Sequence, residues 1–395
     1  MKNFTLHNPT KLIFGKNTIS HLSSELDKND KIMLVFGGGS VKKNAVYQQV
    51  VNALKGYTYV EFWGVEPNPT VETLRKAVEL AKKEKVTFLL AVGGGSVIDG
   101  TKLLTAAIPS EEDAWDILIG KKAIEKMLPF GTVLTISATG SEMNSGAVIS
   151  NKATKEKFAN GFDYPKFSIL DPTVLYSLPA YQVANGLADT FVHVTEQYLN
   201  VSDESPLMDR WAEGILQTLL EISPKLLKLH ELPAEEKNEN NEYYDLMSNY
   251  MLCATMALND FISLGITEDW ATHQIGHELT ALEGVTHGES LAIVLPSLLT
   301  VMKGQKFTKL FQYGKRVFNL SENTFETKES VVDAAIAETK TYFRSIGLAT
   351  SLHEKNIDES TVNEIVKRFQ ERNSKMGEAH NIDFQVVEKI LRIAL

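Results

Sequence analysis

Short apolar runs of strand length punctuate the first half of the chain. Four of them occur before residue 171, at residues 31–36 (KIMLVF), 87–92 (TFLLAV), 131–136 (GTVLTI) and 167–170 (FSIL). The first two runs each end in the sequence GGGS. Between them, residues 70–83 carry apolar side chains at helical spacing, and Thr70 stands where a side chain would cap that helix. Strands that alternate with helices predict a mostly parallel sheet covered by helices.

After residue 181 the pattern changes to long amphipathic stretches with almost no strand signal. Apolar residues recur at helical spacing over residues 183–198, 206–227, 243–261, 269–282, 290–302, 329–346 and 362–369. The polar stretch at 234–242 (AEEKNENNE) is expected to be a solvated loop. The sequence therefore predicts an α/β dinucleotide-binding domain over residues 1–178, followed by an all-helical, metal-binding domain over residues 179–395.

The composition is that of an ordinary globular protein. Of the 395 residues, 43% are hydrophobic and 23% charged, which excludes a disordered, collagenous or coiled-coil chain. The formal net charge of −10 disfavours nucleic acid as a partner, because an acidic surface repels phosphate backbones. The single cysteine, Cys253, excludes a disulfide framework and a thiolate zinc site. Without an apolar signal-peptide core or a run of about 18 apolar residues, we expect a soluble, cytoplasmic protein with no membrane partner.

The two GGGS turns are candidates for phosphate binding. Consecutive glycines at a strand end let the backbone approach a ligand, and the helix that follows points free N–H groups at it. Neither turn has the G-x-G-x-x-G fingerprint, because Lys42 and Ile98 stand where its last glycine would be. The glycines could also simply make tight turns, but two such turns in a parallel sheet favour phosphate binding. Residues 135–142 (TISATGSE), after the third run, add hydroxyl and backbone donors.

The first turn also bears on the choice of dinucleotide. An acidic residue beside the adenosine ribose selects NAD, whereas a 2′-phosphate requires small or basic neighbours. Residues 37–40 include no acid, and Lys42 and Lys43 follow them. If this turn faces the ribose, NADPH is favoured over NADH. The alternative is that the two lysines only form a solvated helix face.

Histidines and an aspartate recur at helical spacing in the second half. Asp189 and His193 are four residues apart, His273 and His277 repeat that spacing, and His287 follows. A spacing of four places two side chains on one helix face. Such a set without thiolates suits Fe²⁺, Zn²⁺, Co²⁺ or Mn²⁺. Each histidine taken alone could be an ordinary hydrogen-bonded residue. A metalloprotease is disfavoured, because the second position of H-E-x-x-H is occupied by glutamine here.

Together these motifs resemble the iron-containing (group III) alcohol dehydrogenases. They comprise GGGSxxDxxK at 93–102, TxxxTGSE at 135–142, DxxxH at 189–193 and HxxxH…H at 273, 277 and 287. The similarity covers essentially the whole chain and is strongest to the bacterial branch of butanol dehydrogenases and NADPH-dependent aldehyde reductases. It implies a dehydroquinate-synthase-like fold, with the dinucleotide in the first domain and a divalent metal in the cleft between the two domains.

The resemblance also implies roles for individual residues. The family's metal ligands fall on Asp189, His193, His273 and His287. Cofactor positions fall on Gly37, Gly38, Ser40, Asn68, Gly94, Gly95, Ser96, Asp99, Thr135, Thr139, Asn144 and Lys157. His277, beside the metal but not a ligand, and Asp99 are the candidate catalytic residues. NAD-preferring relatives have an aspartate where this chain has Gly37, which agrees with the predicted preference for NADP(H).

The predicted function is metal-dependent interconversion of aldehydes and primary alcohols with NADP(H), mainly as an aldehyde reductase or butanol dehydrogenase. Three imidazoles and a carboxylate accept either Fe²⁺ or Zn²⁺. An NAD-dependent glycerol-type dehydrogenase and a dehydroquinate-synthase-like lyase are the alternatives within enzymes, and a non-enzymatic binding protein is the third. Apolar residues near the metal motifs (Phe191, Leu264, Trp270 and Leu291) disfavour the phosphorylated substrate of the lyase. The apolar segment at 11–15 could pair across a two-fold axis, which predicts a homodimer.

Overall fold

The computed structural model describes residues 1–200, 205–321 and 324–395. Two compact units are present. The α/β unit comprises residues 7–178 and 233–255, and the helical unit comprises residues 1–6, 179–232 and 256–395. The domains predicted at 1–178 and 179–395 stay a prediction, and the compact units differ from them at residues 1–6 and 233–255.

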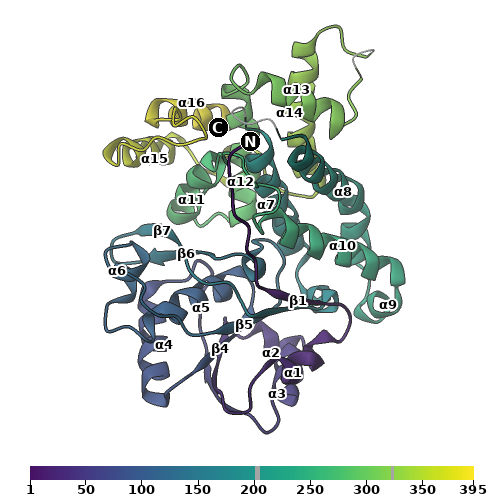
Figure 1. Cartoon of the computed structure of the whole chain (residues 1–395). Coiled ribbons are helices and arrows are strands. Elements are labelled where there is room, and N and C mark those ends of the chain that lie inside the picture. Colours follow the sequence, from purple (N-terminus) through teal and green to yellow (C-terminus); the bar gives the residue numbers. More distant parts are fainter. Residues whose placement is uncertain (201–204, 322–323) are drawn as a thin grey trace. The chain divides into compact units, whose positions relative to one another are not determined.

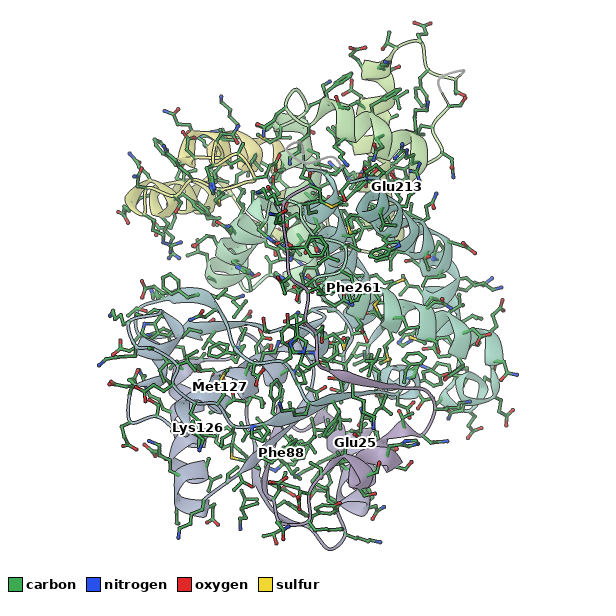
Figure 2. All side chains as sticks on the ribbon, in the orientation of Figure 1. Glu25, Phe88, Lys126, Met127, Glu213 and Phe261 are labelled. Atoms are coloured by element: carbon green, nitrogen blue, oxygen red, sulfur yellow. The ribbon has the colours of Figure 1, made fainter. Side chains whose placement is uncertain are left out.

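Six parallel strands form the sheet of the α/β unit, in the order β1-β8-β5-β4-β2-β3 (Figure 1). They are β1 (Lys11–Phe14), β2 (Lys31–Phe36), β3 (Thr58–Phe62), β4 (Phe88–Gly93), β5 (Phe130–Leu134) and β8 (Phe167–Leu170). Every residue of β4 is buried, as expected for a central strand covered on both faces. At its start, Phe88 (Figure 2) stacks on Phe167 of β8 with 6.1 Å between ring centroids. The four predicted strands are confirmed, with ends shifted by up to two residues.

An antiparallel hairpin adds a second, two-stranded sheet that the sequence pattern does not reveal. It consists of β6 (Gly146–Asn151) and β7 (Glu156–Gly161), with Gly146 opposite Gly161 and Asn151 opposite Glu156. The two strands are as long as β2 and β4, but polar residues and glycines interrupt them, so neither has the continuous apolar run by which the other strands are recognised. The hairpin packs on helix α5 (Gly95–Ala107) through β6.

Short helices complete the α/β unit. They are η1 (Thr18–His21), α1 (Leu22–Glu25), α2 (Ser40–Lys43), α3 (Val46–Ala53), α4 (Val71–Glu84), α6 (Ala114–Leu118), η2 (Ser141–Met143), η3 (Pro172–Ser177), α9 (Ala234–Glu239) and most of α10 (Asn241–Ala257). The predicted cap of α4 is wrong, because the Thr70 hydroxyl donates to Glu66 (2.7 Å) and makes no bond to the helix backbone. The predicted loop at 234–242 is also wrong. Its first six residues form α9, which Lys237 anchors by donating to the carbonyl of Tyr176 (2.9 Å).

The helical unit packs around one central helix, α12 (His287–Val301). Its other helices are α7 (Ala180–Tyr198), α8 (Pro206–His230), α11 (Ala271–Glu283), α13 (Phe307–Arg316), α14 (Lys328–Ser345), η4 (His353–Lys355), α15 (Glu359–Glu371) and α16 (Phe384–Ala394). Helix α12 contacts α7, α11, α14 and α16, which explains why residues 288–299 are buried on every side. Helices α13 and α16 lie outside the predicted stretches. Helices dominate the described part of the chain after β8, which confirms the predicted fold class. None of the described helices is long and apolar enough to cross a membrane.

Candidate metal centre and dinucleotide-binding turns

Three helices bring the predicted metal ligands together in the helical unit. Asp189 and His193 lie one turn apart on α7, His273 lies on α11, and His287 is the first residue of α12. The Nε2 atoms of His193, His273 and His287 lie 3.5, 3.5 and 3.4 Å from Oδ1 of Asp189. Ligands about 2.1 Å from a tetrahedral metal are about 3.4 Å apart, so these separations fit a four-ligand site. Asp189, His273 and His287 also form a potential metal-binding group by themselves.

Two of these ligand atoms are buried without a hydrogen-bond partner among the described residues. They are Oδ1 of Asp189 and Nε2 of His273. A buried polar atom without a partner costs about 1–3 kcal/mol, so the convergence of these atoms on one point is typical of a cation-binding site. Imidazole nitrogens with one carboxylate suit Fe²⁺ or Zn²⁺. The residues present therefore fit a divalent metal.

The electrostatics of the cluster keep its carboxylate ionised. Burial raises the pKa of Asp189, but His193, His287 and His273 outweigh it and hold that pKa well below its usual range. For His273, burial lowers the pKa, whereas Glu196 and Asp189 raise it, to about 9. Metal ligation requires an ionised carboxylate, which Asp189 provides.

Glu196 holds one of the ligands, His273, by the ring nitrogen that faces away from Asp189. It was not identified from the sequence. This residue of α7 accepts a hydrogen bond from Nδ1 of His273 and another from the backbone N–H of Thr272 (2.5 Å). A carboxylate on the far nitrogen fixes the tautomer of a ligating histidine and leaves Nε2 for the metal. The spacing of three residues between His193 and Glu196 on one helix is the signal that could have identified it.

His277 and Trp270 flank the ligands. The ring of His277 stacks on His287, with 5.2 Å between centroids, and lies 6.3 Å from His273. The ring of Trp270 lies 5.1 Å from His273, which gives the cluster an aromatic neighbour. Phe191, in contrast, is fully buried against Tyr342 and Phe343, with ring centroids 4.7 and 5.6 Å away, and so belongs to the core. Its use as evidence for an apolar substrate is therefore wrong.

In the α/β unit, the two GGGS turns lie at neighbouring strand ends. They follow β2 and β4, which are adjacent in the sheet. Strand β3 pairs with the other side of β2, so the connections after β2 and β4 diverge to opposite sides of this point. Parallel sheets bind ligands at such a switch point, outside the carboxyl ends of the strands. Gly37, Gly38 and Ser40, on one side, and Gly94, Gly95 and Ser96, on the other, thus flank the expected crevice.

The glycines of the two turns differ in what lies beside them. A Cβ on Gly95 would lie 2.4 Å from Oγ1 of Thr139, so only glycine lets that threonine approach the start of α5. A Cβ on Gly38 or Gly39 would meet nothing within 4 Å, so the chain itself leaves room beside this turn. Thr135, just after β5, is tied to the same edge by donating its N–H to the carbonyl of Gly93 (3.0 Å).

Three predicted cofactor residues from different elements also meet. The backbone N–H of Asn68 donates to the Ser96 hydroxyl (3.3 Å), and Lys157 of β7 donates to Oδ1 of Asn68 (3.0 Å). The hairpin thus brings its lysine to the second GGGS turn. This convergence supports a ligand contact there, although the roles of these residues stay a prediction.

Asp99 and Asn144 take part in the hydrogen bonds that join residues 141–148 to helix α5. Asp99 accepts hydrogen bonds from Ser141 Oγ (2.6 Å) and from the backbone N–H of Val148 (2.9 Å), and burial raises its pKa although Lys102 acts against this. Asn144 is held by Lys102, which donates to its Oδ1 (2.9 Å). Both oxygens of Asp99 are thus occupied within the chain, and its catalytic role stays a prediction.

A carboxylate near the first turn accepts hydrogen bonds from two aromatic side chains. Glu61 lies near the end of β3, where dinucleotide folds commonly place the acid that binds the ribose. Its two oxygens accept hydrogen bonds from Tyr47 Oη (2.9 Å) and Trp63 Nε1 (2.7 Å). Trp63 stacks on Phe36 and carries the Lys42 ammonium 4.0 Å above its ring. Both partners of Glu61 are neutral donors, and Lys42 is an exposed basic group beside this turn.

Comparison with known proteins establishes the family. Residues 9–172 match the family model of iron-containing alcohol dehydrogenases, and residues 183–395 match the C-terminal model of the same family. The chain belongs to the iron-containing alcohol dehydrogenases. This confirms the resemblance drawn from the motifs.

Individual members of the family are similar over their full length. The chain is 46% identical, over 400 residues and 100% of both proteins, to the NADPH-dependent aldehyde reductase YqhD of Escherichia coli. The substrate- and cofactor-free structure of that reductase matches this one with a TM-score of 0.90, at 44% identity and 100% coverage of both chains. The NADH-dependent butanol dehydrogenase A of Thermotoga maritima matches with a TM-score of 0.89, at 36% identity and 100% and 99% coverage.

Proposed function

We propose that this iron-containing alcohol dehydrogenase reduces aldehydes to primary alcohols with NADPH and catalyses the reverse oxidation. The observation that carries the proposal is the convergence of three imidazole nitrogens on one buried carboxylate oxygen at 3.4–3.5 Å. In the reduction, the aldehyde carbon takes a hydride from NADPH and its oxygen takes a proton, which leaves the alcohol and NADP⁺. An NADPH-dependent aldehyde reductase at 46% identity supports this substrate class.

The helical unit would bind and activate the carbonyl oxygen. Asp189, His193, His273 and His287 would hold Fe²⁺ or Zn²⁺, whose Lewis acidity polarises a carbonyl and stabilises the alkoxide. Glu196 keeps His273 in the tautomer that this requires. His277, whose ring stacks on that of His287, would deliver the proton to the alkoxide oxygen. A His277→Ala enzyme with the wild-type rate at every pH would remove this residue from the proton path.

The α/β unit would bind the dinucleotide at its strand ends. Backbone groups of the two GGGS turns would contact its phosphates, with Thr135, Thr139, Asn144 and Lys157 as further contacts. The exposed Lys42 beside the first turn and the lack of an acidic residue at positions 37–40 support a 2′-phosphate and hence NADP(H). Asp99 would hold the segment that contains Asn144.

The test is the initial rate of NADPH and NADH oxidation with butanal, before chelation, after chelation, and after refilling with Fe²⁺ or Zn²⁺. We expect activity that favours NADPH, disappears with the metal and returns on refilling. Loss of activity that neither metal restores would contradict the proposed chemistry and favour the lyase. A preference for NADH would contradict the argument from Lys42 and leave the metal chemistry intact.

We also propose that the enzyme is a cytoplasmic homodimer. The edge position of β1 in the sheet supports pairing with a second copy, since an edge strand offers backbone groups for another strand. Its one cysteine, Cys253, is buried and free, which suits a reducing compartment. Sedimentation velocity is expected to give twice the 43.9 kDa chain mass, and a monomer would refute the dimer.

A further inference from the structure

We propose that Asn185 is a positioning residue that caps helix α12 from helix α7 and thereby fixes His287 next to Asp189. The inference rests on the proposed metal site. Asn185 lies one turn before Asp189 on α7, and His287 opens α12, so a bond between the two helices here acts directly on the ligand geometry.

The start of α12 lacks a cap from its own side chain. Thr286 occupies the N-cap position but makes no side-chain hydrogen bond to its own helix. Its hydroxyl donates instead to Oδ1 of Asn185 (2.7 Å). The same oxygen accepts the backbone N–H of Glu289 (2.9 Å), the third residue of α12. This N–H is one that an N-cap side chain ordinarily satisfies, so Asn185 supplies the missing acceptor from the neighbouring helix.

The carboxamide of Asn185 is held in one orientation. Its Nδ2 donates to the carbonyl of Tyr181 (2.8 Å), one turn earlier on the same helix. Oδ1 must therefore face α12, where both of its partners are donors. The side chain can neither rotate nor exchange its two ends without losing three hydrogen bonds.

The backbones of the two helices touch at this point. A Cβ on Gly288 would lie 2.2 Å from the carbonyl oxygen of Asn185. Glu289 fastens the contact further, since it accepts from Tyr181 Oη (2.6 Å) and pairs with Lys355 (2.8 Å). Because His287 is the terminal residue of its helix, its position depends on this contact more than that of a mid-helix ligand does. Losing the acceptor of Asn185 frees the end of α12 and lets the imidazole leave Asp189.

The test compares Co²⁺ affinities by the visible d–d absorption of the bound ion, in competition with a chelator. We expect Asn185→Ala to weaken Co²⁺ binding by about 10- to 100-fold, as loss of a residue behind a metal ligand does. Asn185→Asp keeps the acceptor oxygen and is expected to restore most of the affinity. The control is Asp358→Ala, which removes the N-cap of α15 in the same unit and should leave Co²⁺ binding unchanged.

A second pair of variants separates this inference from the proposed site. If Asn185 acts through His287, Asn185→Ala should cause no additional loss in a His287→Ala background. An equal loss in both backgrounds, or no loss with His287 present, would overturn the inference while leaving the ligand set intact. Unchanged Co²⁺ affinity in His287→Ala alone would overturn the ligand set and the inference together.

Discussion

The two candidate sites of this molecule are built in opposite ways. The metal cluster consists of side chains on three helices, with three histidine nitrogens 3.4–3.5 Å from one carboxylate oxygen, and all but His287 are buried. The dinucleotide turns consist of backbone at strand ends, with open space beside Gly38 and Gly39. A site made of side chains depends on charge pairing and on how the helices dock. A site made of turns depends on where side chains are absent.

Two buried lysines repeat the contrast. In the helical unit, Lys306 pairs with Asp269 (2.9 Å) and Glu378 (2.7 Å), and these carboxylates raise its pKa although burial lowers it. In the α/β unit, Lys102 donates to Ser141 Oγ, Asn144 Oδ1 and the carbonyl of Gly146, at 2.7–2.9 Å. Lys306 balances the charge of Asp269, which also accepts the first backbone N–H of α11. Lys102 ties the segment 141–146 to helix α5.

The comparison predicts that charge behind the ligands matters most in the helical unit. Replacing Glu196 by Gln removes the carboxylate that holds His273, so we expect metal affinity to fall by about 10- to 100-fold. Chelator competition measures this. The matched control is Glu213→Gln on α8, a buried carboxylate paired with Arg210 and Arg316, which should leave metal affinity unchanged. Equal losses in both variants would show a general effect of charge.

The buried ion cluster of the helical unit should make its stability depend on pH. Burial and the neighbouring Asp269 raise the pKa of Glu378 from about 4.5 to about 7, although Lys306 acts against this. Between these values Glu378 binds more protons in the folded protein than in the unfolded chain. Its contribution to the free energy of unfolding therefore decreases as pH rises through this window.

Urea unfolding of wild type and Glu378→Gln across that window measures the effect. The glutamine carries no ionisable group, so the part of the decrease that Glu378 contributes should disappear and the slope should become less steep in the variant. The exposed control Glu371→Gln should keep the wild-type slope. Equal slopes in wild type and Glu378→Gln between pH 4.5 and 7 would contradict the assignment.

In the α/β unit, adding one methyl group at either of two glycines should distinguish an effect on packing from an effect on dinucleotide binding. Gly95→Ala forces a Cβ against Thr139, so we expect a loss of about 1–3 kcal/mol in stability together with weaker NADPH binding. Gly38→Ala adds its Cβ in open space, so the unfolding midpoint should stay constant while the KM for NADPH rises. An unchanged KM in the Gly38 variant would show that the dinucleotide does not occupy this space.

The smallest effect is expected at the surface of the first turn. Lys42→Glu reverses the charge above Trp63 and should lower the preference for NADPH over NADH by about threefold to tenfold, because exposed charges are screened. Ratios of kcat/KM for the two dinucleotides measure this. Lys43→Glu, one residue further along α2, is the control for net charge and should change the preference less.

Helical spacing is a local property, so the sequence predicts a metal cluster of one aspartate and four histidines. The choice of four ligands among them rests on the resemblance to the family and stays a prediction. Asp189 and His193 must share a face of α7 wherever that helix packs. The same spacing places Asn185 and Glu196 near that face of α7, but it does not reveal what they bind. Their partners, Glu289 and His273, lie on other helices, and only the docking of α7 on α11 and α12 brings them together.

In the α/β unit, the apolar strands were predictable and the features set by tertiary contact were not. Buried strands such as β2 and β4 can be identified from their continuous apolar runs. The hairpin of β6 and β7 lacks such runs, since polar residues and glycines interrupt its strands and β7 is largely exposed, yet its Lys157 donates to Asn68. Polar composition also concealed α9, which a buried Lys237 anchors.

X-ray absorption at the metal edge of the iron- or zinc-loaded enzyme tests the central claim most directly. The account predicts four nitrogen or oxygen neighbours at about 2.0–2.2 Å, including three imidazoles, and two imidazoles in the His193→Ala variant. Fewer than three imidazoles in the wild type, or no change on replacing His193, would contradict the four-residue site.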